Sequence, residues 1–295
     1  MTSLCFVAVA LILLLLQSNE ALSIQRNIAT RGRMAQRLHA SPSSSSAGPD
    51  LVNNLFGQVA ESIKGIFALK GTGKTAKASS AKEYDAEIAA TKAFLVKAAE
   101  TKQESSEAVC DRLLALEKLM RAKSKLDDGA TSRDTLKNLN GAWRLVFTTG
   151  TIDTQKKYGK VNYFPIKAAQ CFDTSTMTLT NGIFIGDFAV LKFFGDFVWK
   201  EKARKLEFDF DAIAVLGAKF NLPKGGAAKI GSSTGLGSDN NIELVDKGAK
   251  PFFNWISADG DIATARGGGG GLALWRRDRD MEARNQAEKE QAVSA

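Results

Sequence analysis

Histidine is almost absent from this 295-residue chain, which contains His39 and no other. His39 lies in an N-terminal stretch that we expect to be removed, so the remaining chain would have no imidazole. Imidazole is the usual general base and a common metal ligand near neutral pH, and its absence excludes Ser-His-Asp and Cys-His nucleophilic chemistry and histidine metal sites. We therefore expect no catalytic residue, no metal site and no cofactor.

Cysteine is also scarce, with Cys5, Cys110 and Cys171 in the whole sequence. Cys5 falls in the N-terminal apolar run, which leaves two cysteines in the rest of the chain. Two cysteines make no disulfide framework, and their spacing matches no metal-ligand pattern. A single bridge between Cys110 and Cys171 stays open.

The balance of charge excludes a further class of function. The chain has 40 basic and 32 acidic residues, a formal charge of +8, and part of the excess lies in the first 49 residues. The remainder is mildly basic without a concentrated basic stripe. Such a balance suits weak attraction to anionic lipid head groups and argues against nucleic-acid binding.

The N-terminus indicates a destination. Residues 4–16 form an apolar run that is shorter than the about 20 residues of a membrane span, so residues 1–21 are typical of a secretory signal peptide. Residues 22–49 carry arginine and serine but no acidic residue and no lysine, which is typical of a transit peptide. The pair resembles the two-part presequence of algae with secondary plastids and predicts a plastid location. A secreted protein with a disordered linker is the alternative.

Residues 50–82 are predicted to contain an amphipathic helix and a linker. Apolar residues recur at intervals of three and four within 50–69, and this face would either pack on the domain or lie on a membrane surface. Residues 70–82 read as a Lys/Gly/Ser/Thr/Ala linker. Residues 68–75 match a loosened phosphate-binding loop, but no buried strand precedes them, which favours the linker.

Residues 84–125 are predicted to be helical, because Val109, Leu113, Leu116 and Met120 form one stripe at helical spacing. The sequence Asp-Asp-Gly at 127–129 would end this segment.

From residue 141 onward the apolar period changes to two, which predicts strands. We expect a hairpin that turns at Asn181-Gly182, a second that turns at Gly195-Asp196, and a strand at 206–211 with one wet face. The last strands are expected at 241–245, 251–256, 261–266 and 272–276, after a long loop at 218–240. The fold class predicted is mainly β, an antiparallel barrel of about eight strands preceded by helices. The charged residues 278–295 would form a frayed helix or a tail.

Two segments bracket this region and carry a family resemblance. Residues 139–149 read LNGAWRLVFTT, and residues 255–267 read WISADGDIATARG before a glycine stretch and the strand LALWR at 272–276. Their order and spacing resemble the opening and closing strands of the plastid lipid-associated protein (fibrillin) family, over roughly residues 85–277. The resemblance implies a lipocalin-like domain at 83–277. The glycine stretch at 267–271 is longer than is usual in the family.

A barrel of about eight strands has an interior that fills with side chains or holds one small ligand. The chain has 17 phenylalanines, most of them on predicted strands, and apolar rings would suit a quinone, carotenoid or tocopherol. The alternative is that these rings are simply core, which is the more frequent role of phenylalanine on strands, and both interpretations stay open. The residues proposed to contact a ligand are Trp143, Phe147, Phe188, Phe208, Trp255, Asp261 and Arg266.

Charged residues inside the two motifs also have two interpretations. Asp261 and Arg266, with Arg144, would either orient the head group of a ligand or form a structural ion pair that pins the last strand to the first. Glu207, Asp209 and Asp211 share one strand face, but no second cluster meets them. A solvated face explains these three better than a calcium site.

The resemblance implies a non-catalytic protein that associates peripherally with thylakoid or plastoglobule lipids and binds or shields a small isoprenoid-type molecule. Two alternatives remain. One is a lipocalin-like enzyme of isoprenoid or xanthophyll metabolism that would work with Asp, Glu, Tyr or Lys. The other is an accessory or chaperone-like factor that delivers a quinone or steadies a photosynthetic complex. The oligomeric state is unknown from sequence.

Overall fold

The structure, a computed structural model, describes residues 74–152, 155, 163–164, 166–233 and 239–294. Contacts between residues divide the chain into two units, and the unit that contains residues 81–295 holds the β-sheet. The expected signal peptide, transit peptide and amphipathic helix at 50–69 lie outside the described residues.

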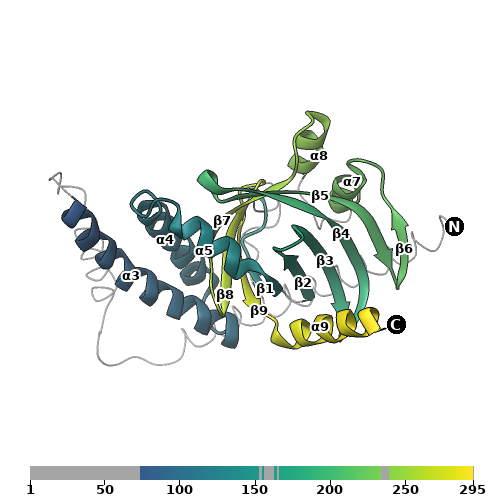
Figure 1. Cartoon of the computed structure of the whole chain (residues 1–295), viewed down its shortest axis with the longest axis horizontal. Coiled ribbons are helices and arrows are strands. Elements are labelled where there is room, and N and C mark those ends of the chain that lie inside the picture. The colour runs from purple at the N-terminus through teal and green to yellow at the C-terminus, as the bar shows by residue number, and fades with distance from the viewer. Residues whose placement is uncertain (1–73, 153–154, 156–162, 165, 234–238, 295) are drawn as a thin grey trace, which may run out of the picture. The chain divides into compact units, whose positions relative to one another are not determined.

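The described strands form one antiparallel sheet in the spatial order β4-β3-β2-β1-β9-β8-β7-β5-β6. Because β4 also pairs with β5, eight of these strands close into a barrel, and β6 branches from β5. The protein is therefore mainly β, a lipocalin-like closed barrel preceded by helices (Figure 1). The strands are β1 (Gly141–Thr148), β2 (Lys167–Asp173), β3 (Thr178–Ile185), β4 (Phe188–Lys200), β5 (Lys205–Val215), β6 (Ala218–Asn221), β7 (Phe252–Ala258), β8 (Ile262–Gly267) and β9 (Leu272–Arg277).

The barrel closes at a narrow seam between β5 and β7. Three residue pairs join these strands, from Lys205 opposite Asn254 to Glu207 opposite Phe252. Farther along, β5 pairs with β6 instead, and the helices α7 (Gly226–Ser233) and α8 (Asp239–Asp246) lie in the connection from β6 to β7. By contrast, β4 and β5 pair along ten residues.

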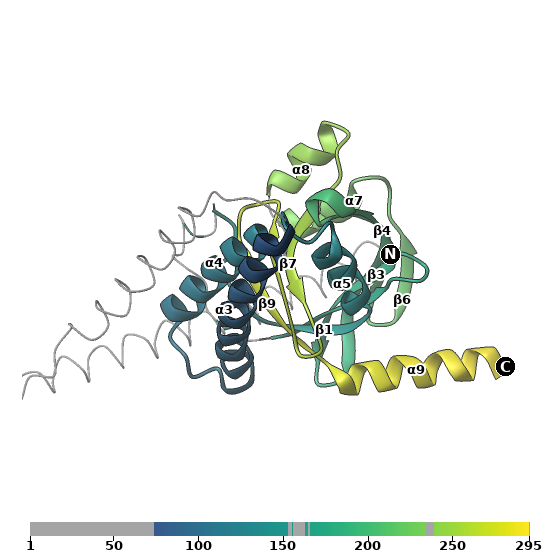
Figure 2. The same ribbon diagram turned by 60° about the vertical axis from the view of Figure 1, so that its left-hand side comes forward.

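Two helices cover the outer face of one side of the barrel. These are α3 (Lys74–Thr101) and α4 (Ser106–Lys123), which Figures 1 and 2 both show side by side near β7 and β9. The stripe predicted from sequence is confirmed, because Val109, Leu113 and Leu116 have no exposed surface and pack in one cluster with Leu272 and Leu274. The helical segment is divided, since Ser105 caps α4 by accepting a hydrogen bond from the amide of Ala108 at 3.2 Å.

The N-terminal part of α3 differs from the expectation for residues 70–82. The helix begins at Lys74, so residues 74–82 are helical rather than linker. This stretch is rich in alanine and lysine, residues of high helix propensity. Lys74 and Thr75 of the loosened phosphate-binding pattern thus lie in the first turn of a helix, and the glycines before them lie outside the described residues.

A short helix that sequence did not predict lies against one end of the barrel. It is α5 (Ala130–Leu139), which starts directly after Gly129, a residue with φ of 81°. Leu139 is fully buried in the barrel's interior cluster, and its carbonyl accepts a hydrogen bond from Trp143 Nε1 at 2.8 Å. This helix therefore helps to fill the end of the barrel at which β1 begins.

The expected tail is a docked helix, α9 (Arg279–Ser294). Met281 is 4 % exposed and packs with Ala142 and Ala169 on the outer face of β1 and β2. Glu282 accepts a hydrogen bond from the amide of Ala142 at 3.0 Å and pairs with Arg277 at 2.7 Å. The compact domain thus extends past residue 277. The helix α9 carries no apolar stripe, but the buried side chain of Met281 and several ion pairs hold it against the barrel.

The hairpin turn predicted at Asn181-Gly182 is wrong. Strand β3 runs through both residues, and Asn181 lies opposite Gln170 of β2 and Phe193 of β4. A Cβ on Gly182 would lie 2.8 Å from the ring of Phe184, so glycine is required here for close packing rather than for a turn. The turn lies instead at residues 186–187, where Gly186 has φ of 60°.

The second predicted turn, at Gly195-Asp196, is also wrong. Strand β4 continues through Gly195, where the register with β5 shifts by one residue. A Cβ at this position would lie 1.8 Å from the carbonyl oxygen of Asp209. The glycine therefore marks a bulge at which two backbones approach closely.

The segment between β6 and β7 also differs from the prediction. Residues 241–245, expected as a strand, belong to α8, and the expected loop at 218–240 contains β6 and α7. The remaining predicted strands are confirmed as β1, β5, β7, β8 and β9. Short apolar runs such as 241–245 fit a helix or a strand equally well.

Candidate functional site: the aromatic interior of the barrel

The interior of the barrel is built mainly of aromatic side chains. Alternation along each strand sends every second residue inward, and these residues form one buried cluster. Its large members are Leu139, Trp143, Phe172, Leu179, Phe197, Leu206, Trp255 and Trp275, against which Leu145, Trp199, Phe208, Phe210 and Phe253 pack half-buried.

The rings form a continuous series across the interior. From Phe193 the contacts run through Phe210 and Phe208 with centroid separations of 5.4 and 5.3 Å. Phe208 stacks on Phe253 at 5.3 Å with an interplanar angle of 16°, which joins β5 to β7 across the seam. Trp255 then meets Trp275 at 5.3 Å and Phe172 at 5.6 Å. These separations are typical of favourable aromatic pairs.

Two polar groups inside this apolar space have no hydrogen-bond partner. They are the side-chain oxygen of Gln170 and Nε1 of Trp255, both buried. Gln170 is 7 % exposed and lies opposite Trp143 on the adjacent strand, and Trp255 is 1 % exposed. An unpaired buried polar group costs about 1–3 kcal/mol of stability. A ligand that forms a hydrogen bond with the oxygen of Gln170 or with Nε1 of Trp255 would remove that cost.

Three of the predicted ligand-contacting residues meet in this interior. Trp143, Phe208 and Trp255 all belong to the interior cluster or pack against it. Trp143 is also covered by the guanidinium of Arg277, whose Cζ lies 4.4 Å from the ring centroid. Arg277 donates to the carbonyls of Asn138 and Asn140 and so ties the same end of the barrel together.

Phe147 does not face the interior. The register of β1 against β9 shifts between Leu145 and Phe147, so strict alternation from Trp143 fails at that bulge. Phe147 packs instead under α3 and α4, 1 % exposed and edge-on to Tyr163 at 5.6 Å. Phe188 lies at the start of β4 and is 57 % exposed, so it does not line the interior either.

Asp261 and Arg266 do not pair with each other. Arg266 makes a two-pronged contact with Glu117 of α4, Nε to Oε1 at 2.9 Å and Nη2 to Oε2 at 2.5 Å. Its other nitrogen donates to the carbonyl of Gly270 in the glycine stretch at 2.7 Å. The hydrogen bond from Arg266 keeps the pKa of Glu117 below its usual value. The predicted ion pair between Asp261 and Arg266 is therefore wrong, and Arg266 joins β8 to the helix α4 instead.

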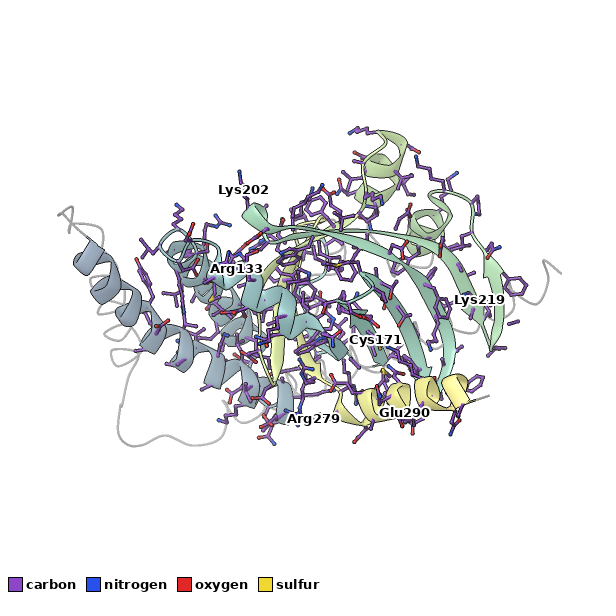
Figure 3. All side chains as sticks on the ribbon, in the orientation of Figure 1. Arg133, Cys171, Lys202, Lys219, Arg279 and Glu290 are labelled. Atoms are coloured by element: carbon purple, nitrogen blue, oxygen red, sulfur yellow. The ribbon has the colours of Figure 1, made fainter. Side chains whose placement is uncertain are left out.

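Asp261 and Arg144 line a separate surface cleft of about 350 Å³ on the outside of the barrel beside α3. Arg144 lies opposite Arg276 on the neighbouring strand, and Arg276 pairs with Glu100 at 3.4 Å. Burial and the nearby Arg144 lower the pKa of Lys102. Asp261 pairs with Arg279 at 3.4 Å, and Figure 3 labels Arg279 close to the start of α9. The acidic and basic residues that line the cleft balance in number, so it does not form a strongly charged pocket.

The carboxylates of β5 belong to its outer face. Glu207 pairs with Lys205 at 2.8 Å, and Asp209 accepts a hydrogen bond from the amide of Phe210 at 3.0 Å. In the described ranges no group of three or more His, Cys, Asp or Glu residues is placed to hold a metal ion. Cys110 and Cys171 are both free thiols.

Sequence reasoning missed Gln170 and Arg277. Gln170 stands in a strand, residues 167–173, that was not predicted, because its alternation of small and polar residues is weak. Arg277 follows Trp275 at a spacing of two and so was recognisable as inward-facing, but it lies at the boundary at which the tail was expected to begin.

Comparisons with known proteins assign no family. No family model matches the chain, and no curated protein matches it. Among solved structures, the chain is similar to an uncharacterized protein from Bacteroides eggerthii, with 11 % sequence identity, 48 % of this chain and 99 % of that chain covered, and a TM-score of 0.29. Similarity at this level carries no argument about function. Among the described helices, none combines the length and the apolar composition needed to cross a membrane.

Proposed function

We propose that this protein is a non-catalytic carrier that binds one small isoprenoid-type molecule inside its barrel. The barrel fold is compatible with such a ligand, and its interior offers aromatic surface from several strands. The observation that carries the proposal is the pair of unpartnered buried groups, Gln170 Oε1 and Trp255 Nε1.

These two groups narrow the chemistry of the ligand. A carbonyl oxygen would accept from the indole N–H of Trp255, and a hydroxyl would donate to the oxygen of Gln170. A quinone has the first group, a tocopherol the second, and a carotenoid that carries a hydroxyl also has the second. The rings of Phe208 and Phe253, half-buried beside the seam, would enclose the apolar part of such a molecule.

The proposal extends to the cellular setting that the sequence suggests. The presequence features and the resemblance to plastid lipid-associated proteins support a plastid protein that associates peripherally with thylakoid or plastoglobule lipids. The absence of histidine after residue 39 supports a role without histidine-based catalysis.

Native mass spectrometry of the protein purified from its source tests the proposal. We expect a hydrophobic small molecule to travel with the folded chain and to be released on denaturation. Titration with a decyl-tailed benzoquinone and with tocopherol should quench the interior tryptophans. A chain that carries no such molecule and is quenched by neither probe would contradict the proposal.

A matched pair of variants tests the role of the unpartnered acceptor. Gln170→Leu should weaken binding of a hydroxyl-bearing ligand about tenfold, since one hydrogen bond is worth about 1 kcal/mol and its loss adds a desolvation cost. The apoprotein should become more stable, because a buried unpaired acceptor is removed. Gln286→Leu, the same change on an exposed site of α9, should alter neither quantity.

A further inference from the structure

Large exposed apolar side chains gather at one end of the barrel. At this end β3 and β5 finish and β4 and β6 begin. Ile185 and Phe188 are each 57 % exposed, Leu216 is 51 % exposed and Phe220 is 41 % exposed. We call these four residues the hydrophobic rim. They are half of the exposed large apolar residues in the described chain, so the clustering is not the usual scatter of single apolar residues over a surface.

Two tight turns carry the rim. Ile185 and Phe188 face each other across the turn at residues 186–187. Leu216 and Gly217 form the turn between β5 and β6, with Val215 opposite Ala218. Both sites are tips of hairpins, and figure 3 places Lys219 near the second tip and Lys202 at the opposite end of the β4–β5 pair. Tips project from a barrel and can enter another phase without disturbing the sheet.

Leu216 occupies its tip at a conformational cost. Its φ is +50° and that of Gly217 is +87°, the two positive values that a type I′ turn requires and that favour Asn-Gly. Leucine is disfavoured in this left-handed region. Leu216 is also 51 % exposed, so about half of its side chain is open to contacts outside the protein.

The rim continues the apolar inner face of the barrel. Leu179 belongs to the interior cluster, and alternation places Asn181, Ile183 and Ile185 on the same face of β3. The apolar surface therefore runs from the aromatic interior to the exposed tips. A hydrophobic molecule entering from this end would meet mainly apolar side chains, with Asn181 as the polar residue between Leu179 and Ile183.

Basic residues flank the rim. Lys192 and Lys219 lie over the ring of Phe194, at 5.7 and 4.5 Å from its centroid, and Lys219 is exposed beside the turn between β5 and β6. At the first tip, Asp187 pairs with two basic residues, Lys167 at 3.0 Å and Arg284.

We propose that the hydrophobic rim is the surface by which this protein inserts into an anionic lipid surface, with the mouth of the barrel facing the lipid. Apolar tips flanked by basic residues match a lipid interface, where apolar side chains enter the acyl boundary and cations meet anionic head groups. A peripheral attachment of this kind lets a water-insoluble ligand pass between lipid and barrel without crossing water. The transfer of a ligand between lipid and barrel rests on the proposed carrier function.

Binding to vesicles of phosphatidylcholine with and without phosphatidylglycerol tests the rim. The protein should be used in the form that accumulates in the cell, with variants expressed from the same gene. We expect it to bind the vesicles that contain phosphatidylglycerol, and to bind them less as salt rises. Phe188→Ser combined with Phe220→Ser should weaken binding at least about tenfold, because two large apolar side chains leave the lipid.

Leu216→Asn separates membrane binding from folding. Asparagine suits the left-handed turn, so thermal stability should be retained or raised. Vesicle binding should fall several-fold, because the lipid no longer buries one apolar side chain. Met177→Asn is the matched control, since Met177 also has a positive φ of 56° and is 37 % exposed, but lies at the turn before β3, at the opposite end of the barrel. It should bind vesicles as the unaltered protein does.

Failure of the rim proposal can be distinguished from failure of the carrier proposal. For this, quinone binding is measured in the absence of lipid on the same protein preparations. Rim variants that bind vesicles normally, or an unaltered protein that binds none, would overturn the rim proposal whatever the quinone titration shows. Loss of vesicle binding in rim variants with normal quinone binding supports the rim and the carrier together. Rim-dependent vesicle binding by a protein that carries no hydrophobic molecule and binds neither quinone nor tocopherol supports the rim and removes the carrier function.

Discussion

The contact between Arg266 and Glu117 shows how a single pair fixes a helix to the barrel. Arg266 lies in β8 and Glu117 in α4, with side chains 29 % and 15 % exposed. We expect Arg266→Met to destabilise the protein by about 1.5–3 kcal/mol, the range for hydrogen bonds to charged groups. Chemical denaturation at neutral pH measures this loss. Arg121→Met is the control, because Arg121 is 68 % exposed and meets the same carboxylate at 3.4 Å; it should cost about 0.5 kcal/mol or less.

The same pair predicts a pH dependence. Arg266 lowers the pKa of Glu117 from 4.5 in the folded state, so the unfolded chain takes up a proton first as the pH falls. The stabilisation from this pair is complete above pH 4.5 and is lost as the pH falls through the lowered folded pKa. The stability difference between the unaltered protein and Arg266→Met should therefore shrink in acid. A difference that is constant from neutral pH into acid would contradict this assignment.

Gly195 is required by a close approach between two backbones. Because a Cβ would lie 1.8 Å from the carbonyl oxygen of Asp209, Gly195→Ala must displace a strand. We expect a loss of about 3 kcal/mol or more, at the upper end of overpacking costs. Thermal melting measures it. Gly260→Ala, with nothing within 4 Å of the added carbon, should melt like the unaltered protein, and equal melting of both alanine variants would contradict the bulge.

At the scale of elements, the C-terminal helix α9 shields Cys171. The thiol contacts Met281 Sδ at 3.6 Å and accepts from Asn285 at 3.4 Å, and its burial raises its pKa. Figure 3 labels Cys171 beside this helix. Removing residues 279–295 should expose the thiol, lower its pKa toward the ordinary value and speed its reaction with a disulfide reagent by at least about tenfold.

Two controls belong to that experiment. Cys171→Ser in the shortened chain should abolish the new reaction, since Cys110 stays buried on α4. Met281→Asp should loosen the helix without shortening the chain and give part of the same increase. An unchanged reaction rate, with the near-ultraviolet circular dichroism retained, would mean that α9 does not cover Cys171.

Helices and strands with a strong local pattern of apolar residues were predictable from sequence. Elements whose conformation depends on pairing with neighbouring strands were not. The stripe from Val109 to Met120 and the alternation around Trp143 each reflect burial on one face, so the helix and the strand follow directly. Asn181-Gly182 has the composition of a turn, but its neighbours on β2 and β4 extend past it and keep it in a strand. Tertiary pairing overrides turn propensity there.

The candidate site was predictable to a similar extent. Trp143, Phe208 and Trp255 were identified because inward-facing aromatic residues follow the period of a strand. Phe147 was misplaced because a bulge resets that period without any mark in the sequence. The partner of Arg266 was also beyond reach, since Glu117 lies 149 positions away on a helix whose docking only the folded chain reveals.

At the scale of the whole molecule, the strand pairing that closes the barrel is shortest between β5 and β7. Three residue pairs close it, supported by hydrogen bonds from the amide of Phe208 to the carbonyl of Pro251 at 3.0 Å and from Trp255 to Arg204 at 2.9 Å. Strands with few ladder contacts open more readily than the rest of a sheet. Hydrogen exchange should therefore be faster for amides of Phe252–Asn254 than for those in the middle of β3 and β4.

The stack of Phe208 on Phe253 should govern how often that seam opens. The rings join the two strands at 5.3 Å and are half-buried, so Phe208→Ala removes both an aromatic pair worth about 0.5–1.5 kcal/mol and the burial around it. We expect exchange at the seam to rise about tenfold or more in this variant, while β3 changes little. A ligand held between the rings should slow the same amides in the unaltered protein, because it binds the closed barrel and not the open one. Uniform acceleration across all strands would show instead that the barrel unfolds as one unit and that the seam has no separate opening.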